Sequence, residues 1–172
     1  LASFKRNDQL SSESGLKYFV LSALSSGLLL YGCSLIYGFS GSTNFDQISN
    51  NISEVQYGLT LGIVFILVGL AFKISAVPFH MWAPDVYQGS PTSVTIFFAI
   101  LPKIAALSVF IRFLYVPFIN LIDQWQTIII FVSIASMVFG AVAAIGQKNL
   151  KRLMAYSSCL LYTSDAADDD HC

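Results

Sequence analysis

Long apolar runs separated by short polar stretches dominate this sequence. Four runs reach the length of about twenty residues that a helix needs to cross the hydrocarbon core of a bilayer. Residues 40–56 form a polar loop after the first run, and Pro117 and Asp123 mark a short loop before the last. The pattern predicts an all-α, polytopic membrane protein with about four transmembrane helices, over residues 16–39, 57–88, 92–115 and 126–146.

The second run is too long for one straight span. As a single helix, residues 57–88 would be roughly 48 Å long at ~1.5 Å per residue, against a core of about 30 Å. Pro78 lacks the amide hydrogen that would bond the carbonyl of Ile74, and Pro84 lacks the one that would bond the carbonyl of His80. Pro84 would therefore be a second break point. Freed carbonyls in a membrane must be buried in protein or line a wet cavity. We therefore predict that the second span is discontinuous.

Composition agrees with a membrane protein. The chain has 172 residues, of which 55% are hydrophobic and only 11% charged, and its mean hydropathy is +0.68. A soluble domain has about a quarter charged residues. No basic tract long enough to bind nucleic acid is present, and the start of the chain lacks the apolar core of a secretion signal. We expect a lipid bilayer, and no nucleic acid, as a partner.

Basic residues cluster at two points that four crossings would bring to the same side. Because short loops rich in lysine and arginine stay on the inner side of a membrane, we expect both clusters there. The loops on the opposite side hold acidic residues such as Asp46 and no basic ones. The two clusters are Lys5, Arg6 and Lys17 before the first span, and Lys148, Lys151 and Arg152 after the fourth.

Two lysines lie deep within the predicted spans, each near a proline. Lys103 is at the middle of the third span and follows Pro102, while Lys73 precedes Pro78 in the second. A charged lysine at the centre of a membrane helix costs about 2.5–3.5 kcal/mol on insertion scales, so such residues usually serve a function. We predict that both lysines are steps of a proton relay. The alternative is that each is a structural charge held by one buried carboxylate.

Other residues near the expected break have more than one interpretation. His80 titrates near physiological pH, so it is a possible further relay step or, equally, a polar cap for freed backbone. Asp85 is expected to be a helix cap or turn acceptor. Trp82 and Tyr87 suit the aromatic belt at a membrane interface. Cys33 lies in an apolar run and is expected to be a small buried residue.

No nucleotide-binding loop, nucleophile triad or metal cluster is visible in the sequence. The three cysteines, Cys33, Cys159 and Cys172, have no metal-ligand spacing, and His171 with Cys172 offers too few ligands. We therefore expect no metal site and no chemistry beyond the handling of protons.

The stretches "FKISAVPFHMWAPDVYQGSPTSV" and "PKIAAL" resemble chain 2 of the respiratory NADH:ubiquinone oxidoreductase, complex I. "GLKYFVLSALSSGLLLYG" and "KNLKRLMAYSS" agree in order and spacing, so the resemblance covers about residues 1–158. It implies that this chain is a fragment holding the sixth to ninth helices of a longer protein, with the seventh discontinuous. The family is similar to cation/proton antiporters, which are built from inverted repeats.

The resemblance also assigns roles residue by residue. Lys73 matches the lysine of the broken seventh helix, and Lys103 matches the central lysine of the eighth; both are implied to lie on a proton pathway. A glutamate on the family's fifth helix, which pairs with the first lysine, would precede this chain, and Glu13 is not that residue. A lysine of the twelfth helix is also missing, so the fragment alone is not expected to translocate protons.

The implied function is that of a proton-translocating subunit of NADH:ubiquinone reductase that carries no redox centre itself. NAD, FMN, iron–sulfur clusters and ubiquinone are implied in the parent complex, and other complex I membrane subunits are implied as partners. The mitochondrial inner membrane is the favoured location, with plastid and bacterial membranes left open. The alternatives are a stand-alone cation/proton antiporter and a structural membrane scaffold.

The resemblance divides the chain into three parts. Residues 1–15 are a polar lead-in, residues 16–158 are the antiporter-like transmembrane fragment, and residues 159–172 are an acidic tail. The tail departs from the family, which would continue with an apolar helix containing glycine. We expect no membrane helix through it and interpret it as foreign sequence.

Overall fold

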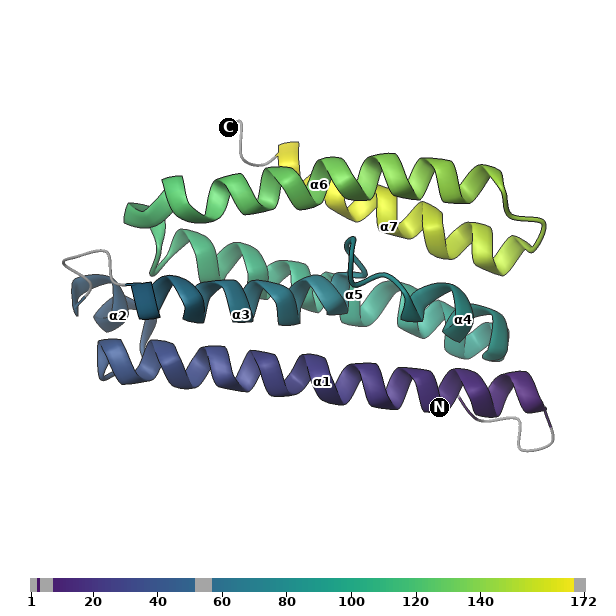
Figure 1. Ribbon diagram of the computed structural model, residues 1–172, viewed down its shortest axis with the longest axis horizontal. Helices are drawn as coiled ribbons and strands as arrows, with labels where there is room; N and C mark the ends of the chain where they lie inside the picture. The colour runs from purple at the N-terminus through teal and green to yellow at the C-terminus, as the bar shows by residue number, and fades with distance from the viewer. Residues whose placement is uncertain (1–2, 4–7, 52–56, 169–172) are drawn as a thin grey trace.

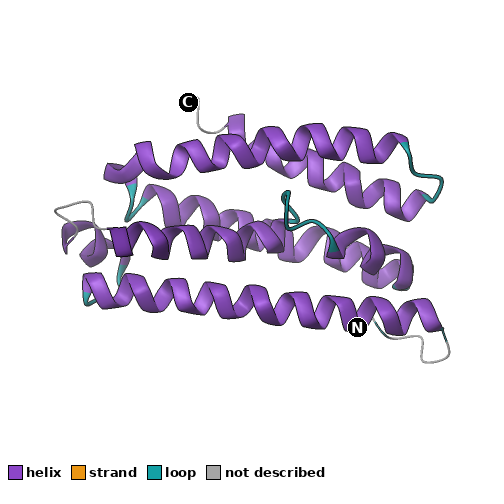
Figure 2. Ribbon diagram, viewed as in Figure 1, coloured by secondary structure: helices purple, strands orange, loops and turns teal. Residues whose placement is uncertain are grey.

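The computed structural model describes residue 3 and residues 8–51 and 57–168, without the side chains of residues 120 and 161–168. The predictions made for Lys5, Arg6, His171 and Cys172 fall outside the described residues. Within them the chain forms helices and no strand (Figure 2). The helices are α1 (Gln9–Ser40), α2 (Phe45–Asn51), α3 (Tyr57–Ile74), α4 (Trp82–Gly89), α5 (Thr92–Tyr115), the 3-10 helix η1 (Ile119–Leu121), α6 (Ile122–Ile145) and α7 (Leu150–Asp168).

In the part of the chain that the structure describes, four helices, α1, α3, α5 and α6, are long and apolar enough to cross a membrane. The predicted all-α, multi-pass fold is therefore confirmed. The third span has the predicted bounds, whereas α6 begins earlier than expected and α1 begins at Gln9. The carboxylate of Asp8 accepts from the backbone N–H of Leu10 at 3.2 Å and caps that earlier start. The loop predicted over residues 40–56 contains the short helix α2.

The long helices lie roughly side by side, and α3 and α4 follow one another along nearly one line (Figure 1). The backbones of α1 and α3 approach closely at Gly32 and Gly62. A side chain added at Gly32 would come within 2.8 Å of the carbonyl oxygen of Gly62, so only glycine permits this approach. Large apolar side chains on the outer faces of α1, α5 and α6 are exposed, as expected of surfaces that meet lipid or neighbouring helices.

The second span is discontinuous, as predicted, but α3 ends before either proline. Ser75 adopts a left-handed conformation with φ 68°. The N–H of Ser75 bonds the carbonyl of Phe72 at 3.2 Å, and the N–H of Ala76 bonds that of Ala71 at 2.9 Å. This pair of bonds closes a helix when the residue after its last turn is left-handed. The break therefore starts at Ser75, earlier than the sequence indicated.

The two prolines have different roles from the predicted ones. Pro78 lies inside the break, beyond the residue that ends α3. The expectation that Pro84 frees the carbonyl of His80 is wrong, because the N–H of Ala83 bonds that carbonyl at 3.1 Å. Pro84 instead lies in the first turn of α4, where a helix does not need its N–H. In the third span, α5 runs through Pro102 without interruption.

The tail is helical as far as the structure describes it. Helix α7 continues to Asp168, past the predicted boundary at residue 158, although α7 is not one of the four candidate spans. Cys159 is buried with 2% of its surface exposed. The division of the chain at residue 159 stays a prediction.

The described residues of both basic clusters lie at one end of the bundle, as the sequence predicts. The start of α1, the turn between α4 and α5, and the loop between α6 and α7 lie at one end (right in Figure 1). Helix α2 and the connection from α5 to α6 lie at the other. Lys17, Lys148, Lys151 and Arg152 thus belong to the first end, and Asp46 belongs to the second.

This arrangement predicts opposite labelling of two exposed positions. In the full-length protein, with Cys33 and the other native cysteines replaced, Lys148→Cys should react with an impermeant thiol reagent only from the inner side. Asp46→Cys should react only from the outer side, because an odd number of spans separates the two positions. Labelling of both positions from the same side in sealed vesicles would contradict the four-span topology.

Candidate functional site

Lys103 is sealed inside the bundle. It lies on α5, and none of its surface is exposed. Its ammonium donates a hydrogen bond to the Oγ of Ser158 on α7 at 2.7 Å, and it lies 5.8 Å from the centre of the Tyr87 ring on α4. A hydroxyl acceptor and an aromatic face both stabilise a cation away from water. Residues from three helices, α4, α5 and α7, thus build the surroundings of this one charge.

Lys73 has a different environment. It lies in the last turn of α3, where the helix macrodipole is negative and favours a cation. Its side chain is half-buried, and its Nζ lies 5.9 Å from the centre of the Phe72 ring. No carboxylate among the described residues lies within ion-pair distance of it. The early end of α3 therefore positions Lys73 at a helix terminus rather than within a helix.

Protein groups hold the backbone of the break. The thiol of Cys159 donates to the carbonyl of Ser75 at 2.8 Å, and the N–H of Val77 donates to the Oγ of Ser136 on α6 at 2.9 Å. The indole of Trp82 donates to the carbonyl of Phe72 at 2.9 Å. Side chains of α4, α6 and α7 thus bind three backbone groups in and beside the break.

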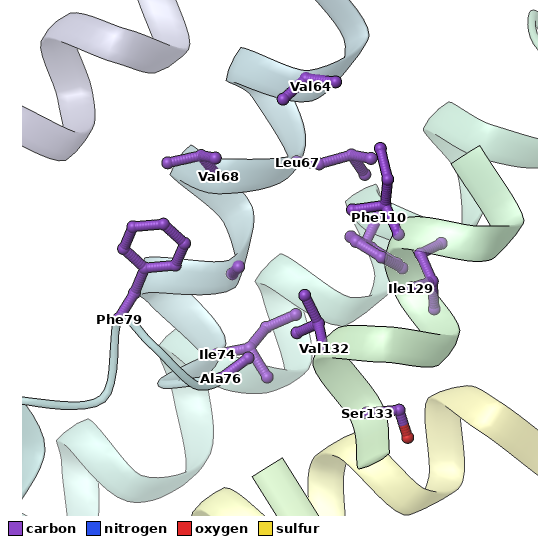
Figure 3. Close-up of a pocket in the computed structure, with 12 residues that line it drawn as sticks. Val64, Leu67, Val68, Ile74, Ala76, Phe79, Phe110, Ile129, Val132 and Ser133 are labelled. Atoms are coloured by element: carbon purple, nitrogen blue, oxygen red, sulfur yellow. The ribbon is translucent and has the colours of Figure 1, made fainter. Parts of the chain in front are cut away.

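The cavity beside the break is apolar. It holds about 80 Å³ and lies among α3, the break, α5 and α6 (Figure 3). Ile74, Ala76 and Phe79 contribute from the second span, and Ser133 is the polar residue of its lining. A cavity with this lining favours hydrocarbon over water. The cavity does not provide the wet passage that a break beside Lys73 had suggested.

His80 lies in the break and is half-buried. Its ring is 4.5 Å from that of Phe139 on α6 and 6.3 Å from that of Tyr156 on α7, measured between ring centres. These aromatic contacts fix the imidazole between two helices. The proposed role of His80 in a relay stays a prediction.

Asp85 forms a charged link that the sequence analysis missed. Its carboxylate pairs with Lys17 on α1 at 2.9 Å and with Arg152 on α7 at 2.6 Å. The expectation of a helix cap or turn acceptor is therefore wrong, because the carboxylate binds two cations and the residue that precedes α4 at the cap position is Met81. The link ties α4 to α1 and α7 at the basic end of the bundle. The available signal was that the second span ends on the side where both basic clusters are predicted, and Asp85 lies near that end.

Two further expectations from the sequence, one for Trp82 and Tyr87 and one for Cys33, are wrong. Trp82 and Tyr87 are buried, with 3% and 1% of their surfaces exposed, instead of forming an interface belt. Both lie on α4, which is packed between α1 and α7, so neither reaches the surface. Cys33 is exposed, because it lies on the outer face of α1. Among the described residues, no group of three or more histidine, cysteine or acidic side chains could hold a metal ion.

The sequence that forms this arrangement matches a known family. Residues 1–160 match the sequence model described as NADH:quinone oxidoreductase/Mrp antiporter, transmembrane. The chain belongs to this family. The family resemblance found in the sequence is thereby confirmed.

Two similar proteins with curated sequences are bacterial. NADH-quinone oxidoreductase subunit N of Pelagibacter ubique is 79% identical over 158 residues, which make up 92% of this chain and 34% of the relative. The same subunit of Rhodospirillum rubrum is 60% identical over 161 residues, which make up 92% of this chain and 33% of the relative. The chain thus spans about a third of the length of these relatives. Because they are bacterial, they do not support the expected mitochondrial location.

Solved structures share the fold. Respiratory complex I from Thermus thermophilus contains a similar chain with a TM-score of 0.80 and 37% identity, covering 94% of this chain and 34% of that one. A membrane-bound sulfane sulfur reductase, an archaeal respiratory membrane complex, gives a TM-score of 0.84 with 28% identity, covering 95% and 34%. The Mrp complex from Dietzia gives 0.83 with 25% identity, covering 91% and 29%.

Proposed function

We propose that the full-length protein containing this chain is a proton-translocating membrane subunit of an NADH:quinone oxidoreductase. The observation that carries the proposal is Lys103, a fully buried lysine at the middle of a membrane-spanning helix. The family and the identity of 79% to a subunit N support the assignment to this enzyme complex. Electron transfer from NADH to quinone, with its FMN and iron–sulfur clusters, takes place in partner subunits.

The two lysines are the proton-carrying groups of the proposal. A lysine inside a protein exchanges its proton, whereas an arginine keeps it. Lys103 has a hydroxyl and an aromatic ring to hold its charge, and Lys73 has the end of α3. Each of the two sites can thus hold a positive charge. At Lys73, no carboxylate among the described residues contributes to this. We place the carboxylate partner of Lys73 on a helix outside this chain, as the family resemblance implies.

A stand-alone cation/proton antiporter is the second candidate, because the Mrp complex has the same fold. Such a protein should carry acidic ion ligands within a span. Asp85, the acidic residue of the second span, is bound to Lys17 and Arg152 at the basic end. A cation would have to displace both. The geometry therefore favours the respiratory subunit. A purely structural scaffold would not need a buried lysine such as Lys103.

Purification of the full-length protein distinguishes these functions. With an affinity tag on that protein, NADH:quinone reductase activity should co-purify, and inverted membrane vesicles should take up protons when NADH is added. The uptake should not require sodium. A tagged protein that purifies without the reductase, and that exchanges sodium for protons in vesicles, would favour the antiporter. Proton uptake that survives replacement of both Lys73 and Lys103 by methionine would favour the scaffold.

A further inference from the structure

A largely apolar groove that contains a few hydroxyl groups reaches the residue that contacts Lys103. The groove lies between α5 and α7 and has a volume of about 670 Å³. Its polar residues are Tyr87, Thr92, Thr95, Ser157, Ser158 and Lys151. Lys103 itself is sealed, whereas Ser158 is half-buried and lines the groove. Ser158 therefore lies between the buried charge and the open space.

The hydroxyl of Ser158 both accepts and donates a hydrogen bond. Its oxygen accepts from the Lys103 ammonium at 2.7 Å, and its own proton is donated to the carbonyl of Ala155 at 2.9 Å. A serine hydroxyl has one proton and two lone pairs, and it turns freely about its carbon–oxygen bond. The same oxygen therefore accepts from a charged lysine, and by turning its proton the hydroxyl can donate to a neutral amine.

Contacts on either side of Ser158 fix its position. Arg152, on the same helix, pairs with Asp85 of α4 at 2.6 Å. The next residue, Cys159, donates to the carbonyl of Ser75 in the break at 2.8 Å. Helix α7 is thereby tied to both halves of the second span, and Ser158 is held against Lys103 by more than their own hydrogen bond.

We propose that Ser158 is the positioning residue of Lys103, accepting a hydrogen bond from its ammonium and donating one to its neutral amine. The inference rests on the proposed function, in which Lys103 gains and loses a proton. No net proton is transferred to the serine; its hydroxyl turns between Ala155 and Lys103 as the lysine changes state. Ser158 thus keeps the lysine side chain at one place in the bundle in both states.

The test uses the full-length protein in its assembled complex. Ser158→Ala should lower NADH-coupled proton uptake by inverted vesicles roughly tenfold, the order expected for losing a hydrogen bond to a charged group. Uptake is normalised to the amount of assembled complex. Ser158→Thr keeps the hydroxyl at a position that is only half-buried, so it should restore most of the uptake. Ser157→Ala removes a hydroxyl from the same groove and is the matched control, expected at the parental rate.

A double variant separates this inference from the proposed function. If Ser158 acts through Lys103, Ser158→Ala should add no further loss to Lys103→Met. A further loss, or failure of Ser158→Thr to restore uptake, would overturn the inference. Parental uptake in Ser158→Ala together with loss in Lys103→Met would overturn the role of Ser158 alone. Parental uptake in Lys103→Met would overturn the proposed function. Should Ser158→Ala not assemble, Ser158→Cys, with a weak acceptor of similar size, gives the same comparisons.

Discussion

Lys73→Met is expected to lower NADH-coupled proton uptake on the order of tenfold or more, because it removes a group that exchanges protons. The assembled complex should remain near its parental amount, since methionine has a similar length and the Lys73 side chain is only half-buried. Lys73→Arg should fail as well, because arginine does not release its proton in a protein. The measurement is proton uptake by inverted vesicles during NADH oxidation.

The control for this prediction is a lysine outside the membrane. Lys148 is exposed in the loop between α6 and α7, so Lys148→Met makes the same chemical change away from the site. It should leave proton uptake at the parental rate. If Lys73→Met also pumps at the parental rate, Lys73 is a structural charge, and the end of α3 merely accommodates it.

Ser75→Val is expected to prevent assembly of the complex. Ser75 has a φ of 68° and no exposed surface. A β-branched side chain is strongly disfavoured in the left-handed region. One methyl group of valine takes the place of the hydroxyl, and the second has to enter a fully buried site. The combined cost is roughly 2–4 kcal/mol, a large part of the stability of a typical protein. The measurement is the amount of assembled complex in membranes, separated on a native gel.

Ser75→Gly is the matched variant. Glycine adopts a left-handed conformation without strain, and the substitution removes a buried hydroxyl that has no hydrogen-bond partner. It should therefore assemble at least as well as the parent. Equal assembly of the glycine and valine variants would show that the backbone at Ser75 does not determine where α3 ends.

The existence of the break could be predicted from the sequence, but its position could not. The length of the second run and its prolines predicted an interruption between Lys73 and the next span, and the structure has one. The position of the interruption was not predictable, because the left-handed residue that follows the last turn of α3 is a serine. A left-handed helix end is usually marked by glycine. Here Ser75 is held in that conformation by a buried site and by its contact with Cys159, which is remote in sequence.

The candidate site divides in the same way. The sequence identified both lysines, because a charge within an apolar run is conspicuous whatever the fold. It gave no sign that Lys103 would be sealed and Lys73 half-buried, nor that Ser158 and Tyr87 would surround Lys103. Asp85 was assigned a local role because its two partners come from α1 and α7. Each missed contact joins residues on different helices.

By itself, the sequence determined the number of spans, the presence of a break and the two lysines within apolar runs, whereas the orientation of the spans stays a prediction. These follow from the length of apolar runs and from the cost of placing charges and free carbonyls in hydrocarbon, which depend on local composition. The tertiary structure decided where α3 ends, which groups receive its backbone, and which atoms hold each charge. Those outcomes depend on the packing of α4 between α1 and α7. The partners of a hydrogen bond or an ion pair come within bonding distance only when the helices pack together.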